Sequence, residues 1–217
     1  MKSVAHLKEK AILLRNKNLS VNDIGKMLSI SKSTICSWVK DIPITKTIKQ
    51  TLAQQIGSAA NKEKYRKIRE EYYQQGIKEY NELKNHLTFR DFIMIYLTEG
   101  YRKDKNSVSV CNSNPKIMKL SYYWITKLKT EGRKFDFQVQ IHEDQYPEEV
   151  KNFWASILKI NTEEIKIFPK SNSGKLKGRN WRSEFGVLTI RLGDTQLRSK
   201  IQAYMDKLEE SWEKIYE

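Results

Sequence analysis

Two helix-start signals separated by a tight turn, within residues 19–39, restrict the fold of this chain more than any other feature. Ser20 is followed three residues later by Asp23, the spacing of a capping box with Asp in place of the usual Glu. Ser29 and Ile30 then provide a short turn, and Ser31 is positioned to cap the next helix. We therefore predict three short helices over residues 4–41, the last of them at about residues 32–40.

The apolar residues of this window are spaced so that each of the last two helices has one inward face. Gly25 is predicted to lie where the two helices cross closely, because it has no side chain. In the turn, Ile30 is expected to point inward. The other inward positions are Ile24, Met27, Leu28, Ile35, Trp38 and Val39.

The outer face of the last helix carries short or flexible side chains and no glutamate. Such a helix can lie close to base edges and phosphates in a DNA major groove. Over about residues 5–42 the chain resembles the helix-turn-helix of resolvases, transposases and related regulators, which implies that this helix reads DNA. A helical hairpin used only for protein contacts is the alternative. The outer positions are Ser31, Lys32, Ser33, Cys36, Ser37 and Lys40.

The charge of the chain agrees with a nucleic-acid partner. There are 40 Lys and Arg against 26 Asp and Glu, a formal net charge of +14. The excess is denser in residues 1–87, with 17 basic and 8 acidic residues, than in residues 88–217, with 23 and 18. Such an excess attracts polyanions, and DNA or RNA is the usual partner. The alternative is that the lysines only serve solubility.

Other classes of protein are disfavoured. No apolar run approaches the ~20 residues that a membrane span needs, and we interpret the N-terminal stretch as a helix and not as a signal peptide. The cysteines, Cys36 and Cys111, are far apart and form no CxxC pattern, so we expect neither a disulfide framework nor a zinc site. The three histidines are isolated, without metal-ligand spacing. A cytoplasmic protein without a membrane partner is expected.

Residues 46–87 are polar and rich in good helix formers, which predicts a basic helical connector after a domain of residues 1–45. Its apolar positions are too sparse for a sustained coiled coil. A basic cluster within it could follow phosphates, and the alternative is a solvated helix face. The cluster contains Lys62, Lys64, Arg66, Lys67 and Arg69, with Tyr65 among them.

Residues 88–217 alternate helical periods with short β-rich runs, which predicts a C-terminal α+β domain with helices on one face of a curved antiparallel sheet. Helices are expected at about residues 88–100, 115–129, 147–158 and 194–216. Strands are expected at residues 108–112, 135–142, 164–168 and 184–192.

The stretch FIMIYLTEG, residues 92–100, resembles a LAGLIDADG helix, the motif of a family of homing endonucleases. The Asn-Ser-Asn-Pro turn at residues 112–115 and the Trp-bearing helix after residue 147 are also similar to that family, over about residues 88–207. The resemblance implies a sheet that saddles DNA, and a homodimer in which Glu99 of each copy helps to hold Mg²⁺. Isoleucine and methionine expected to be exposed on the motif helix also favour a homodimer. The chain differs from the family in having Met94 and Leu97 at the positions of the middle glycine and the earlier acid.

A basic loop at residues 169–182 is the second predicted DNA contact, through phosphates. The alternative is an exposed hairpin loop without a ligand. Arg191, on the strand that follows, is expected either to face DNA or to pair with a carboxylate. The cations of the loop are Lys170, Lys175, Lys177, Arg179 and Arg182.

These features favour a sequence-specific double-stranded DNA-binding protein, a regulator of transcription or a mobile-element-derived factor, that does not cleave its target and needs no cofactor. The second hypothesis is a Mg²⁺-dependent site-specific endonuclease with Glu99 as catalytic residue and metal ligand. The third is an RNA-binding protein, against which the helix-turn-helix pattern argues.

Overall fold

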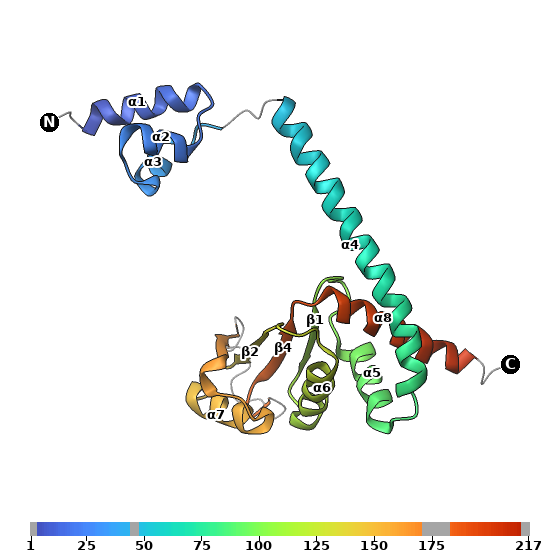
Figure 1. The fold of residues 1–217 in the computed structure, drawn as a ribbon. Coiled ribbons are helices and arrows are strands. Elements are labelled where there is room, and N and C mark those ends of the chain that lie inside the picture. The colour runs from blue at the N-terminus through green and yellow to red at the C-terminus, as the bar shows by residue number, and fades with distance from the viewer. Residues whose placement is uncertain (1–3, 44–47, 171–182, 214–217) are drawn as a thin grey trace. The chain divides into compact units, whose positions relative to one another are not determined.

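A computed structural model describes residues 4–43, 48–170 and 183–213 (Figure 1). Contacts within the chain divide it into two compact units, Met1–Lys62 and Glu63–Glu217. In the described part, no helix is both long and apolar enough to span a membrane.

The first unit contains the three predicted short helices, α1 (Val4–Asn16), α2 (Val21–Leu28) and α3 (Lys32–Val39). Both predicted caps are present: the Ser20 hydroxyl accepts from the Asp23 N–H, and the Ser31 hydroxyl accepts from the Thr34 N–H. Ser29 ends α2 in the left-handed region, with φ of 55°. A small apolar core holds the three helices together, formed by Ala11, Ile24, Ile35 and Val39, all almost fully buried.

Two details of this unit differ from the prediction. Met27 is 63% exposed, because the apolar contact of α2 runs through Ile24 and Leu28, one helical turn apart, and Met27 lies to the side of that line. Gly25 does not mark a helix crossing. A Cβ atom there would lie 3.0 Å from the carbonyl oxygen of Ile30, so the close approach is to the turn that follows α2.

The predicted connector is one long helix, α4 (Ile48–Leu83), and its second half is part of the second unit. Its second half packs against the last helix, α8 (Thr195–Glu213), which crosses it near Gly76. Glu79 of α4 accepts from Lys200 Nζ at 2.7 Å and from the Tyr204 hydroxyl at 2.6 Å. Burial, together with the hydrogen bond to Asp206, raises the pKa of Tyr73 to about 12. The second half of residues 46–87 therefore forms a wall of the second unit.

Gly76 sets how closely α4 approaches α8. A Cβ atom at Gly76 would lie 2.8 Å from the Cα of Lys200, so we expect Gly76→Ala to lower the free energy of unfolding by about 1–3 kcal/mol. Gly57, on the same helix, has nothing within 4 Å of such an atom, so Gly57→Ala should instead stabilise by about 0.5–1 kcal/mol through helix propensity. Urea unfolding followed by circular dichroism compares the two variants. Equal shifts would contradict a tight contact between α4 and α8.

The second unit is an α+β arrangement with a four-stranded sheet in the order β1-β4-β2-β3. Its strands are β1 (Val108–Asn112), β2 (Phe135–Ile141), β3 (Ile165–Pro169) and β4 (Val187–Leu192). β4 pairs antiparallel with β1 and β2, whereas β2 and β3 are parallel. The prediction of an antiparallel sheet is therefore wrong for β3. The helix α7 (Pro147–Leu158) carries the chain back to the end of the sheet at which β2 starts, so that β3 can run in the same direction as β2. Parallel neighbours require such a crossover connection.

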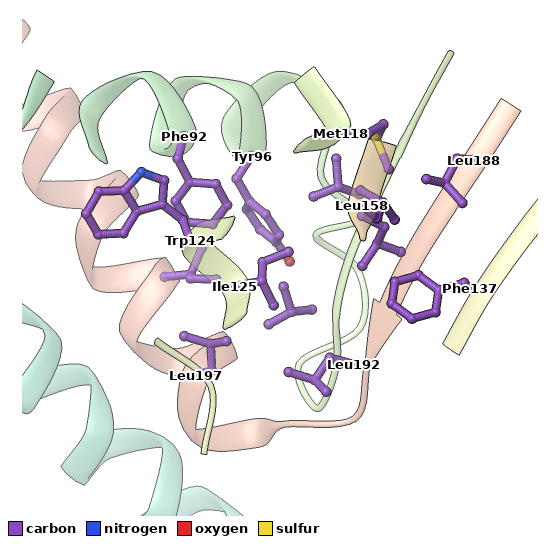
Figure 2. Packing of buried hydrophobic residues seen from close by; sticks show 14 of the residues in the cluster. Phe92, Tyr96, Met118, Trp124, Ile125, Phe137, Leu158, Leu188, Leu192 and Leu197 are labelled. Carbon is purple, nitrogen blue, oxygen red and sulfur yellow. The ribbon is translucent and has the colours of Figure 1, made fainter. Parts of the chain in front are cut away.

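The core of this unit lies between the helices and one face of the sheet. The remaining helices are α5 (Leu87–Glu99), α6 (Pro115–Leu128) and the short 3-10 helix η1 (Thr162–Glu164). Figure 2 shows Phe92 of α5 and Trp124 of α6 in the same apolar cluster as Phe137, Leu188 and Leu192 of the strands. Alternate strand residues point away from this core, so the opposite face of the sheet carries the polar ones.

Candidate nucleic-acid interface

The outer face of α3 is as exposed as the sequence predicts. Its six predicted contact residues, Ser31, Lys32, Ser33, Cys36, Ser37 and Lys40, are all exposed, while Ile35 and Val39 on the other side are buried. The helix carries no acidic residue. The exposed face of α3 therefore carries small side chains and lysines, and the capped turn before the helix fixes where it begins.

The hydroxyl groups on this face are not equally available to a ligand. Ser31 is occupied as the cap of α3, and its Oγ also lies 3.0 Å from Oγ of Ser33. The Ser37 hydroxyl donates to the Thr34 carbonyl oxygen at 2.9 Å, so it can accept from a base but must break this bond to donate. Ser33, like Ser37, shares its hydroxyl with a neighbour, so Lys32, Cys36 and Lys40 are the side chains of this face best placed to contact a duplex.

The open face of the sheet is mostly polar, with Phe168 as an exposed apolar residue, and the charges of Arg191 and Lys166 are paired. Ser109, Arg191 and Asp136 are neighbours across β1, β4 and β2, and the next row contains Cys111, Thr189, Gln138 and Lys166. Arg191 pairs with Asp104 at 3.3 Å and Lys166 with Asp136 at 2.7 Å. Of the two expectations for Arg191, pairing with a carboxylate is confirmed.

Hydrogen bonds and ion pairs lower the pKa of both carboxyl groups. The hydroxyl of Ser107 and the N–H of Asn106, and then Arg191, hold the pKa of Asp104 below its ordinary value. Lys166 is the main cause that lowers the pKa of Asp136. A face on which two cations are offset by two carboxylates provides little net attraction for phosphates, so the excess charge of this unit must lie elsewhere.

Only the first cation of the predicted basic loop is described. Lys170 is exposed just after β3, and its N–H donates to the Ile141 carbonyl oxygen at 2.8 Å. The other four cations, Lys175, Lys177, Arg179 and Arg182, lie outside the described residues. Their contact with phosphates stays a prediction.

The basic cluster of α4 is a mostly exposed helix surface. Lys62, Lys64, Arg66 and Lys67 are exposed and Arg69 is half-buried. Arg66 makes a two-pronged ion pair with Glu63, both contacts at 2.8 Å. Pairing with Glu63 leaves Arg66 less free for a ligand than its neighbours.

Glu99 is the exposed last residue of α5. Gly100 follows it, and a Cβ atom there would overlap the carbonyl oxygen of Tyr96, which explains the glycine at this position. A carboxylate is a suitable donor for Mg²⁺, which takes one or two carboxylates together with waters and phosphate oxygens. Among the residues that the structure describes, no group of three or more His, Cys, Asp or Glu is arranged to hold a metal ion. Glu99 therefore belongs to no such group within the described residues, and a metal ion there would need further ligands.

A cavity of about 390 Å³ in the second unit is lined by cations, of which Arg66 and Arg69 belong to the predicted basic cluster and the others were indicated by no sequence pattern. We call it the arginine pocket. Arg102 and Lys105 come from the loop after α5 and Arg198 from α8, almost a hundred residues later, so no local pattern links them. The pocket is lined by Arg66, Arg69, Glu70, Tyr73, Arg102, Lys105, Arg198, Ser199 and Gln202.

Comparison with known proteins adds no relative: no protein-family model, curated protein or solved structure matches the chain. The observed class is an α+β chain in which a capped three-helix unit precedes a mixed four-stranded sheet covered by helices on one face.

Proposed function

We propose that this chain is a sequence-specific double-stranded DNA-binding protein, acting as a regulator of transcription or a mobile-element-derived factor, that binds its site without cutting it. The observation that carries the proposal is the face of α3. Six exposed residues, none acidic, lie opposite the buried Ile35 and Val39. A helix of this width enters the major groove of B-DNA, where every base pair presents a distinct pattern of donors and acceptors.

The charges support the same partner. Lys32 and Lys40 lie at the two ends of the exposed face, where each can reach a phosphate beside the groove. The formal net charge of +14 adds a long-range attraction that weakens as salt rises, because each neutralised phosphate releases counterions. Affinity for any duplex should therefore fall steeply with ionic strength.

In this proposal the second unit is a LAGLIDADG-like domain that serves for dimerisation and contacts the DNA backbone through its basic loop, not through the charge-paired face of its sheet. The order of helices and strands supports it, whereas the parallel pairing of β2 with β3 differs from the all-antiparallel sheet expected from the resemblance. The apolar surface available for a partner helix is smaller than expected. Met94 is 39% exposed and Leu87 81%, but Ile93 is buried. Sedimentation velocity of the purified chain tests the homodimer.

Selection of bound duplexes from a randomised library tests the function. We expect one enriched sequence, bound about a thousandfold more tightly than a scrambled duplex at physiological salt. Enrichment of no sequence, or equal affinity for the selected and scrambled duplexes, would contradict sequence-specific binding. A single-stranded RNA of the same sequence that binds more tightly than the duplex would favour the RNA-binding hypothesis instead.

The exposed carboxylate of Glu99 at the end of α5 favours a Mg²⁺-dependent endonuclease as the second candidate. Under the proposal, wild-type protein saturating its selected site in the presence of Mg²⁺ leaves both strands intact. The matched variant Glu99→Gln keeps the shape of the side chain and removes its charge. Strand cuts by the wild type that disappear in Glu99→Gln, with unchanged affinity, would replace the proposal by the endonuclease.

A further inference from the structure

The arginine pocket lies within the second unit, between the second half of α4, the loop after α5 and the first half of α8. Its volume of about 390 Å³ is in the range of small-ligand sites, which span about 300–1,000 Å³. Five of the nine lining residues are cations and one, Glu70, is an acid, so the cavity favours an anion.

Arg198 is the side chain that points most strongly to a ligand. It is only 4% exposed, although an arginine is seldom buried without a charged partner. Its Nη atoms donate to the carbonyl oxygen of Arg102 at 3.1 Å and to Oε1 of Gln202 at 3.1 and 3.2 Å, all neutral acceptors. Its buried Nε–H has no acceptor among the described residues. A bound anion stabilises a buried guanidinium more strongly when its other hydrogen-bond acceptors are all neutral than when a carboxylate already pairs with it.

No ion pair joins Arg198 to a carboxylate within the described residues, and Asp206 reaches it only through Gln202. Glu70, on the cavity wall, is exposed and accepts from Gln74. Arg198 also lies 5.9 Å from the centre of the Tyr96 ring, a contact that stabilises a cation without neutralising it. Arg102 and Lys105 are exposed in the loop, where they can close over a bound anion from the solvent side.

We propose that the arginine pocket binds the terminal phosphate or diphosphate group of a small phosphorylated ligand. Phosphate is favoured because the planar guanidinium of arginine matches two phosphate oxygens at once. A small ligand is favoured over a DNA backbone because Arg198 is buried within a cavity, whereas the phosphates of a duplex follow a continuous convex strand. The inference does not depend on the proposed DNA-binding function, although such a ligand would be a natural effector of a regulator.

Titration calorimetry of the whole chain with inorganic pyrophosphate tests the site. We expect binding with one equivalent per chain, and the double variant Arg102→Ala/Lys105→Ala should raise the Kd about tenfold or more. Lys103 is the matched control, because it is exposed in the same loop but does not line the cavity. Lys103→Ala should leave the Kd within about twofold of the wild-type value.

Arg198→Lys keeps the charge and removes the planar fork, so it should also weaken pyrophosphate binding, while circular dichroism verifies that the variant folds. Absence of binding to the wild type would overturn the proposal. So would equal losses in Lys103→Ala and the double variant, which would mark non-specific attraction. A double variant that loses duplex affinity as strongly as pyrophosphate affinity would assign the pocket to the DNA surface instead.

Discussion

Alanine in place of Trp124 should lower the free energy of unfolding of the second unit by about 3–5 kcal/mol. The Trp124 side chain is fully buried at the centre of the core. Its ring packs edge-on against the rings of Phe89 and His86, with centroids 5.2 and 5.0 Å away. Its Nε1–H donates to Thr88 Oγ1 at 3.3 Å. Truncation therefore leaves a large cavity and removes the hydrogen bond to Thr88, whose hydroxyl keeps its contact with His86 Nδ1 at 3.1 Å.

Tyr123 is the matched control for this substitution, because it precedes Trp124 on α6 and is 51% exposed. Tyr123→Ala should cost only about 1 kcal/mol or less. Urea unfolding of both variants, followed by the fluorescence of the remaining tryptophans, measures the difference. A loss in Trp124→Ala no greater than that in Tyr123→Ala would contradict the packing described for this core.

The double variant Lys32→Ala/Ser33→Ala should lose about 1–3 kcal/mol of binding free energy for the selected site relative to a scrambled duplex. Both residues are exposed in the first turn of α3, the part of a recognition helix that contacts base edges. Neither side chain belongs to the apolar core of the three-helix unit, so the fold should be retained. Fluorescence anisotropy with the two duplexes gives the difference directly.

The control for charge is Lys10→Ala, which removes one exposed cation from α1. It should weaken binding to the selected and scrambled duplexes alike, because a cation away from α3 acts only through long-range attraction, which carries no sequence information. If the double variant also weakens both duplexes equally, α3 is not the element that reads the sequence.

Local features of the sequence predicted local structure well. The hydroxyls of Ser20 and Ser31 sit next to the backbone groups that they cap, so the starts of α2 and α3 follow from a few neighbouring residues. The exposed face of α3 follows equally from helical spacing around Ile35 and Val39. This part of the candidate site was therefore predictable.

Features that depend on distant partners were not predictable in the same way. The alternation of residues in β2 and β3 indicates strands, but not that the two strands pair in parallel. In the sequence, Gly76 only lowers the helix propensity of a polar segment, and its close contact with Lys200 is visible only in the fold. Likewise, Arg198 is an ordinary helix residue in the sequence, and only the fold buries it beside Arg102.

The chemical reactivity of Cys36 tests the central claim most directly, because this exposed thiol lies on the outer face of α3. The rate of alkylation by N-ethylmaleimide is measured by mass spectrometry with and without the selected duplex. With duplex at about ten times its Kd, the rate at Cys36 should fall about tenfold, since only free protein reacts. Cys111, exposed on the open face of the sheet, reports in the same experiment whether that face also lies against DNA. An unchanged rate at Cys36 in protein saturated with duplex would contradict the insertion of α3 into a major groove.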